Sequence, residues 1–157
     1  MILGFILSGV VICLDQLTKF LIYGTPARSI IGNVLWFESS LNTGVAFSMF
    51  SGNSYFFAVT AIIASSLFVW LISSKRFFNT KFEKITLGLI LGGTLSNAID
   101  RFIFQGVRDF IYLKFMNFAI FNVADMAITV GAILLCVAIL ISTFKKENNN
   151  KEEKWLN

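Results

Sequence analysis

The sequence predicts an all-α integral membrane protein with four transmembrane helices, a small extracytoplasmic β-rich platform and a short outer lid segment. Hydrophobic residues make up 56% of its 157 residues and charged residues only 14%. Soluble domains carry about 25% charged residues, so this composition is typical of a membrane protein. Four apolar segments are each long enough for the roughly 20 helical residues that cross a bilayer.

The four spans are expected to form one membrane domain, 1–144, followed by a charged cytoplasmic tail, 145–157. They cover approximately residues 1–23, 55–74, 85–104 and 121–144. The first segment could instead be read as a cleaved signal peptide. It has no basic region at its start, and Asp15 and Lys19 stand where a small-residue cleavage site would follow. We therefore interpret it as a retained helix.

Positive charges in the connections predict the orientation of the chain. Basic residues gather in the middle connection and the tail, at Lys75, Arg76, Lys81, Lys84, Lys145, Lys146, Lys151 and Lys154. The two other connections contain only Arg28, Arg108 and Lys114. The positive-inside rule places both termini and the middle connection in the cytoplasm. The net charge of +4 therefore indicates topology and contact with membrane lipid, and no nucleic-acid partner is expected.

The outer connection between the first two spans has the pattern of a small sheet. Three stretches favour β-structure, Ser29–Ile31, Val34–Phe37 and Val45–Phe50, and glycine and asparagine residues separate them. Trp36 and Phe37 suit the membrane interface. We expect this segment to form the platform on the membrane surface.

Four acidic residues from separate segments are expected near the outer interface. Asp15 and Asp100 lie late in spans that run outward, and Asp125 begins a span that runs inward. Asp109 lies in the short connection between the last two spans. Ionisable groups at membrane depth are costly and commonly mark functional sites. Their convergence predicts a site at this face.

Structural roles are an alternative for the helical groups. Asp15 and Lys19 have the i, i+4 order that favours an ion pair, so either a structural salt bridge or substrate contact is possible. Asn97, Asp100 and Arg101 share one helix face, and a polar clamp between helices is the favoured interpretation.

The other two acids also have simple explanations. Asn122 and Asp125 are spaced as the N-cap and third residue of a helix, which is the spacing of a capping box. Asp109 would ordinarily be a solvated acid in a loop, so its importance depends on what it faces.

The residue inventory restricts the chemistry. The chain has no histidine, so Ser39, Ser40 and Ser96 lack the usual base that activates a serine. The available ligands do not match a metal site, and no metal or other cofactor is expected. Two adjacent carboxylates can share one proton, so that one activates water and the other protonates the carbonyl oxygen. This pattern predicts aspartic-protease chemistry.

The alternative is a small proton-coupled transporter that uses Asp15 or Asp125. Transporter sites usually lie near the membrane midplane. The acids here are predicted near one face, which favours the protease.

Five motifs occur in order along the chain: DQLTK at 15–19, NTGVAFS at 42–48, NAIDR at 97–101, VRDF at 107–110 and FNVAD at 121–125. Together they resemble the bacterial lipoprotein signal peptidases (signal peptidase II). The likeness extends from Asp15 to about Ser142 and implies an intramembrane aspartic endopeptidase. Such an enzyme removes the signal peptide from a diacylglyceryl-modified prolipoprotein and cuts before the lipidated cysteine.

The resemblance also implies the site residues and the location. Asp109 and Asp125 correspond to the catalytic pair. The residues expected to shape the site and hold substrate are Asp15, Lys19, Asn42, Asn97, Asp100, Arg101 and Asn122. The protein is expected in the bacterial cell (inner) membrane, acting as a monomer, with its active site near the extracytoplasmic face.

Some positions depart from the family pattern. Ser96 replaces a usual glycine, which predicts slightly looser packing, and Arg108 replaces a commonly apolar residue and is expected to point to lipid headgroups or water. The stretch between the two catalytic acids is short and lacks a proline, which affects the shape of the lid. Because a helix N-terminus favours negative charge, we expect Asp125 to be the base and Asp109 to carry the shared proton.

Overall fold

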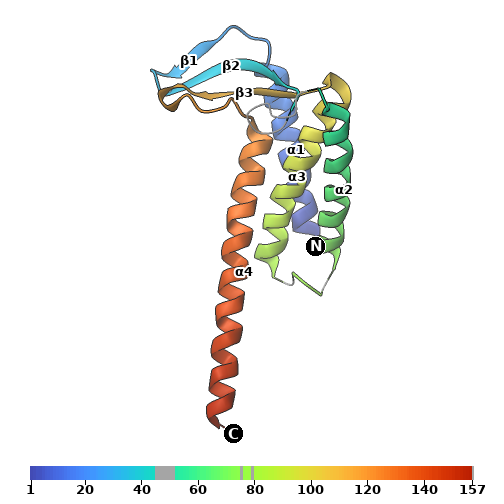
Figure 1. Ribbon diagram of the computed structural model, residues 1–157, viewed down its shortest axis with the longest axis vertical. Coiled ribbons are helices and arrows are strands. Elements are labelled where there is room, and N and C mark those ends of the chain that lie inside the picture. The colour runs from blue at the N-terminus through green and yellow to red at the C-terminus, as the bar shows by residue number, and fades with distance from the viewer. Residues whose placement is uncertain (45–51, 75, 79, 157) are drawn as a thin grey trace.

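The computed structural model describes residues 1–44, 52–74, 76–78 and 80–156, with side chains described as far as residue 144. Four helices and a three-stranded sheet make up this part of the chain (Figure 1). The elements are α1 (Ile2–Ile22), β1 (Arg28–Ile31), β2 (Leu35–Asn42), α2 (Ser54–Ser73), α3 (Lys81–Phe104), β3 (Val107–Leu113), the 3-10 turn η2 (Lys114–Met116) and α4 (Val123–Leu156).

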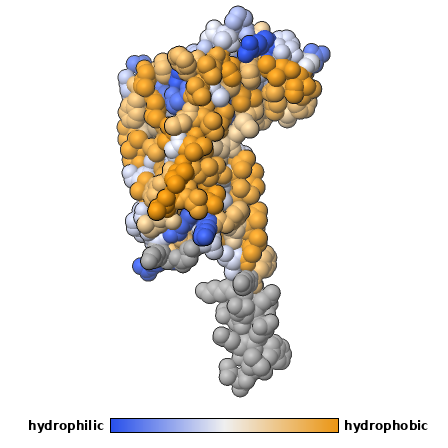
Figure 2. All heavy atoms as spheres, turned by 180° about the vertical axis from the view of Figure 1, so that it is seen from behind, coloured by the Kyte–Doolittle hydropathy of each residue, from blue (hydrophilic) through white to orange (hydrophobic). Residues whose placement is uncertain are grey.

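The four long apolar helices are confirmed. Each contains a segment long and apolar enough to cross a membrane, and in α4 this segment ends at Phe144. Apolar residues cover the helices between hydrophilic groups near the sheet and at the opposite helix ends (Figure 2). The all-α class is not confirmed, because the three strands form a sheet of their own.

The sheet lies at one end of the helices, as Figure 1 shows, with the antiparallel order β1-β2-β3. The β-structure predicted for residues 29–31 and 34–37 falls on β1 and β2, which a turn at Gly32 connects. The stretch predicted at Val45–Phe50 lies outside the described residues. Strand β3 comes from the connection predicted to be a lid, and its Asp109 pairs with Ser40 of β2.

Two helix starts differ from the predicted bounds for local reasons. Helix α3 begins at Lys81, before the predicted start, because Thr80 and Glu83 form a capping box that stabilises a polar first turn. Helix α4 begins only at Val123. The backbone of Phe121 exchanges two hydrogen bonds with that of Ile111, which ties this residue to β3 instead of the helix.

Helix α3 packs against each of the other three helices. Its contact with α1 is a close approach of two backbones. A Cβ atom added at Gly88 would overlap the carbonyl oxygen of Gly4, and one added at Gly4 would lie 2.5 Å from the carbonyl oxygen of Lys84. Small residues permit such contacts between membrane helices, where dispersion and polar contacts replace the hydrophobic effect. This approach places the polar residues of α1 within reach of α3.

Substituting Gly88 should therefore destabilise the protein. In Gly88→Ala the added methyl group meets backbone, which cannot move aside as a side chain can, and a loss of about 1–3 kcal/mol is expected. Gly9→Ala is the matched control, because a Cβ there meets nothing within 4 Å. Unfolding in detergent by heat or denaturant measures both. Equal stability of the two variants would contradict the close approach.

Candidate active site

A completely buried lysine lies at the centre of the polar residues. Lys19 of α1 places its ammonium nitrogen 2.7 Å from a carboxylate oxygen of Asp15 and 3.2 Å from one of Asp100. All three side chains have no exposed surface. An isolated buried charge is very unfavourable, so this cation and these anions depend on one another. The ion pair predicted from the i, i+4 spacing is present.

Asp15 connects three helices. One carboxylate oxygen accepts the backbone N–H of Ala124 at 2.8 Å, in the first turn of α4. The other accepts the hydroxyl of Ser96 on α3 at 2.6 Å, as well as the ammonium of Lys19. A carboxylate at a helix N-terminus satisfies free N–H groups and interacts favourably with the helix dipole. Asp15 therefore holds the start of α4 against α1 and α3.

Lys19 also determines how the amide of Asn97 is oriented. An ammonium group can only donate, so it must face the amide oxygen, which it does at 3.0 Å. The amide nitrogen of Asn97 is then directed away and donates to Asp125 at 2.7 Å. The Asn97 amide thus links the Lys19 ammonium group to the Asp125 carboxylate by two hydrogen bonds.

The amide of Asn122 is also fixed in direction, and it donates to Asp109 as the amide of Asn97 donates to Asp125. The backbone N–H of Asp125 donates to the side-chain oxygen of Asn122 at 2.9 Å, and the N–H of Asn122 donates to the Asp125 carboxylate at 3.2 Å. This is the capping box expected from the spacing. The amide nitrogen of Asn122 is left to donate to Asp109 at 2.6 Å and to the Asn97 oxygen at 3.2 Å. Each carboxylate consequently receives an amide donor whose direction is fixed.

Asp109 is not the solvated loop acid that its position in the sequence indicated. It lies on β3 and only 3% of its surface is exposed. Burial, reinforced by the nearby Asp125 carboxylate, raises the pKa of Asp109 to about 7, against the hydrogen bonds from Asn122 and Asn42 that favour its charged form. Asp109 is therefore suited to carry a proton near neutral pH.

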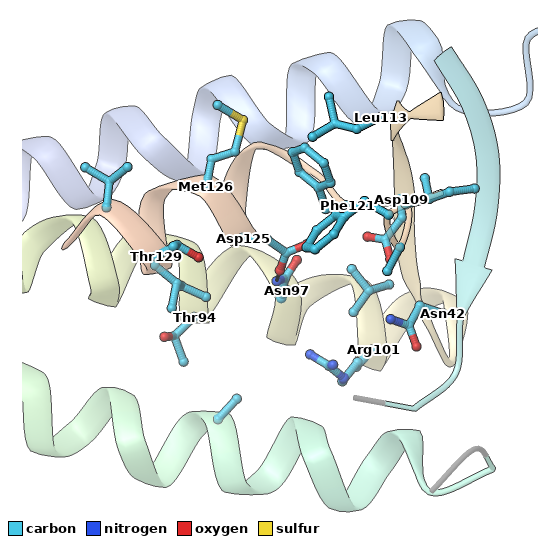
Figure 3. A pocket seen from close by; sticks show the side chains of 17 residues that line it. Asn42, Thr94, Asn97, Arg101, Asp109, Leu113, Phe121, Asp125, Met126 and Thr129 are labelled. Carbon is cyan, nitrogen blue, oxygen red and sulfur yellow. Dashed lines mark hydrogen bonds between the residues drawn. The ribbon is translucent and has the colours of Figure 1, made fainter. Parts of the chain in front are cut away.

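A cavity of about 620 Å³ lies beside these groups (Figure 3). Asp109 from β3 and Asp125 from α4 face it near Asn97 of α3, and Thr94 and Thr129 lie farther along the helices. Of the nine predicted site residues, five line the cavity: Asn42, Asn97, Arg101, Asp109 and Asp125. The other four have no exposed surface and support it from behind: Asp15, Lys19, Asp100 and Asn122.

Arg101 and Asn42 meet at the outer part of the cavity wall. The guanidinium of Arg101 donates to the carbonyl of Gly44 at 3.1 Å and lies 5.9 Å from the ring centre of Phe57. The Asn42 side chain accepts the N–H of Gly44 at 3.0 Å and also hydrogen-bonds Asp109. A cation and an amide therefore border the carboxylates, where they can hold polar groups of a bound chain.

Two expectations about individual residues are wrong. Arg108 does not point to headgroups or water: it is 9% exposed and pairs with Asp100 at 2.8 Å. The packing around Ser96 is not loose, because this residue has no exposed surface and its hydroxyl bonds Asp15. The sequence interpretation also missed Gln16, whose amide nitrogen donates to Ser96 and Asp100. Its position next to Asp15 inside the DQLTK motif was the available signal.

The chemistry that this arrangement supports is general acid–base catalysis by two carboxyl groups. Both groups face one cavity, and Asn122 bonds both of them. Two carboxyl groups that lie close together resist simultaneous ionisation and can share one proton. The ionised member can accept a proton from water while the protonated member donates one to a carbonyl oxygen.

Comparisons with known proteins agree on one family. The family described as signal peptidase (SPase) II, Peptidase_A8, matches residues 7–141. The lipoprotein signal peptidase of Shouchella clausii is 41% identical over 143 residues, which cover 88% of this chain and 93% of the relative. That of Latilactobacillus sakei is 40% identical over 146 residues, covering 90% and 95%.

The fold is also similar to that of a solved protein. A structure described as a bacterial membrane enzyme, determined by the in meso method at 2.3 Å resolution, superposes with a TM-score of 0.82 and 31% identity. The match covers 91% of this chain and 90% of that one. The likeness thus extends over nearly the whole chain in sequence and in structure.

Removing the buried lysine should be strongly destabilising. Lys19→Met leaves the Asp15 carboxylate without its cation, and breaking a buried ion pair in this way costs about 3–5 kcal/mol. Lys81→Met, at an exposed lysine that begins α3, is the control and should change the stability little. Denaturant unfolding in detergent compares them. A Lys19→Met protein as stable as the control would show that the buried charges are independent.

Proposed function

The chain belongs to the signal peptidase II family of membrane proteases that process lipoprotein precursors, and we propose that it acts as an aspartic endopeptidase with Asp109 and Asp125 as its catalytic pair. Its substrate is a prolipoprotein that carries diacylglycerol on a cysteine, and the cut falls just before that cysteine. The observation that carries this proposal is the placement of both carboxylates at a largely apolar cavity that can receive a membrane-embedded peptide.

In the proposed reaction, Asp125 is the base and Asp109 the acid. Asp125 takes a proton from water, whose oxygen attacks the scissile carbonyl carbon, while Asp109 donates its proton to the carbonyl oxygen. The tetrahedral intermediate then collapses: the C–N bond breaks, the nitrogen receives the proton held by Asp125, and a hydroxyl proton of the intermediate returns to Asp109. The pair finishes with the one proton it started with.

The polar residues around the catalytic pair position the two carboxylates and the substrate, and they take no part in the bonds that form and break. Asn97 and Asn122 each direct a donor at one carboxylate, which holds both in place before substrate arrives. Arg101 and Asn42 border the cavity and are proposed to hold the backbone of the substrate. Asp15, Lys19 and Asp100 support these residues from the buried side.

The proposed orientation follows the positive charges. Both termini and the connection between α2 and α3 lie on the cytoplasmic side of the bacterial inner membrane. The sheet and the catalytic pair then lie near the extracytoplasmic face. The sheet is the proposed platform there. The segment after β3 is the proposed lid, since Phe118, Ala119 and Phe121 line the cavity. One chain supplies every proposed site residue, which supports a functional monomer.

Replacing either catalytic carboxylate should abolish cleavage. Asp109→Asn and Asp125→Asn keep shape but cannot exchange the proton, so the rate of cleavage of a diacylglyceryl-modified prolipoprotein in detergent should fall at least about a hundredfold. Glu38→Gln, a carboxylate on β2 outside the cavity, is the matched control. An inactive wild type contradicts the proposed function. An active Asp109 or Asp125 variant contradicts only the assignment of the pair.

The pH dependence of cleavage should show an alkaline limb near neutrality. The raised pKa of Asp109 means that its proton is present below about pH 7 and is lost above it. The general acid then disappears and two anions face each other, so kcat/KM should fall about tenfold per pH unit above this value. A rate that stays constant up to pH 9 would exclude Asp109 as the acid.

A further inference from the structure

Arg108, near the start of β3, forms hydrogen bonds with Asp100 of α3 and Gln16 of α1. Its backbone N–H donates to one carboxylate oxygen of Asp100 at 2.9 Å, and its side-chain Nε approaches the same oxygen at 3.3 Å. Its Nη2 donates to the other carboxylate oxygen at 2.8 Å and to the amide oxygen of Gln16 at 2.8 Å. One side chain thus joins β3 to both α3 and α1.

The guanidinium is also covered by an aromatic ring. It lies 4.1 Å from the ring centre of Phe104, the last residue of α3. Between these two residues the chain reverses through Gln105, which has the left-handed backbone angle φ of 56°. Stacking on a ring and pairing with both oxygens of a carboxylate are geometries that suit arginine and that lysine cannot reproduce. The turn is therefore held by the arginine that follows it.

The next residue along the strand is Asp109. Successive strand residues point to opposite faces, so anchoring Arg108 on the helix side sets the position of Asp109 on the cavity side. We propose that Arg108 is a positioning residue, whose clamp on Asp100 and Gln16 fixes the start of β3 and holds the Asp109 carboxyl group at the cavity. This inference rests on the proposed function, in which Asp109 is the acid.

Arg108 also completes an alternating chain of buried charges. Asp15 pairs with Lys19, Lys19 approaches Asp100, and Asp100 pairs with Arg108. Two anions and two cations balance. Without the arginine, Asp100 would lose its closer cation, and Lys19 would be drawn away from the Asn97 amide that it orients.

The pKa of Asp109 distinguishes a positioning role of Arg108 from a purely electrostatic one. Asp109 is faced by Asp125 from α4, Lys19 from α1 and Arg101 from α3, and burial is the main cause of its raised pKa. If the clamp is lost and β3 loosens, water reaches Asp109 and its pKa falls. If Arg108 acted only as a positive charge, removing it would raise that pKa instead.

The test compares Arg108→Met, Arg108→Lys and Gln16→Leu with the wild type, as purified full-length proteins in detergent, on a diacylglyceryl-modified prolipoprotein. Arg108→Met should lower kcat about ten- to a hundredfold with little change in KM, and shift the alkaline limb of the pH profile to lower pH. Arg108→Lys should restore part of kcat, and Gln16→Leu should cause a smaller loss in the same direction. Arg28→Met, an exposed arginine that also lies over a ring, is the control and should retain wild-type rates.

Melting temperatures of the same samples show that each assay uses folded protein. If Arg108→Met does not fold, the inference is tested on Arg108→Lys and Gln16→Leu alone. Their kcat, KM and pH profiles are then compared with those of the wild type. Variants that cleave with wild-type kcat and pH profile, or whose alkaline limb moves to higher pH, overturn the inference. In either case an active wild type leaves the proposed function standing, whereas an inactive wild type rejects that function first.

Discussion

The ammonium group of Lys19 organises the polar interior of this protein. It lies within 3.2 Å of two carboxylates and an amide oxygen, with no exposed surface. A buried charge is very unfavourable unless oppositely charged and polar groups surround it, so the positions of Asp15, Asp100 and Asn97 depend on this ammonium group. Because Asp15 in turn bonds the backbone of Ala124, the same cation fixes where α4 begins.

Fixed amide orientations follow from that charge. An asparagine side chain can rotate to present oxygen or nitrogen, but Lys19 permits only the oxygen of Asn97 to face it. The backbone N–H of Asp125 imposes the same restriction on Asn122. The two carboxyl groups at the cavity therefore meet donors that are already aligned. Preorganised donors need no reorganisation during the reaction, which is the main advantage of such sites.

The carboxyl groups come from elements of different kind. Asp125 lies in the first turn of a helix, where the dipole favours its charge, and Asp109 lies on a buried strand, where burial favours its protonated form. The proposed assignment of Asp125 as base and Asp109 as acid rests on this difference in location. The antiparallel pairing of β3 with β2, together with the Arg108 clamp, keeps the strand member in register.

The amino-acid sequence by itself determined the four apolar helices, the β-structure of the outer connection, the ion pair of Asp15 with Lys19 and the capping box of Asn122 with Asp125. Each of these depends on composition or on residues at most four positions apart, where the physics is local. Only the tertiary structure decided that Asp109 is buried on a strand, that Arg108 points inward and that Gln16 joins the polar cluster. Those outcomes rest on contacts between different elements, such as the pairing of Asp109 with Ser40 and the hydrogen bonds of Gln16 with Asp100 and Arg108, which are 84 and 92 positions away. No local pattern encodes such pairings, because they exist only once α1, α3 and β3 are packed together.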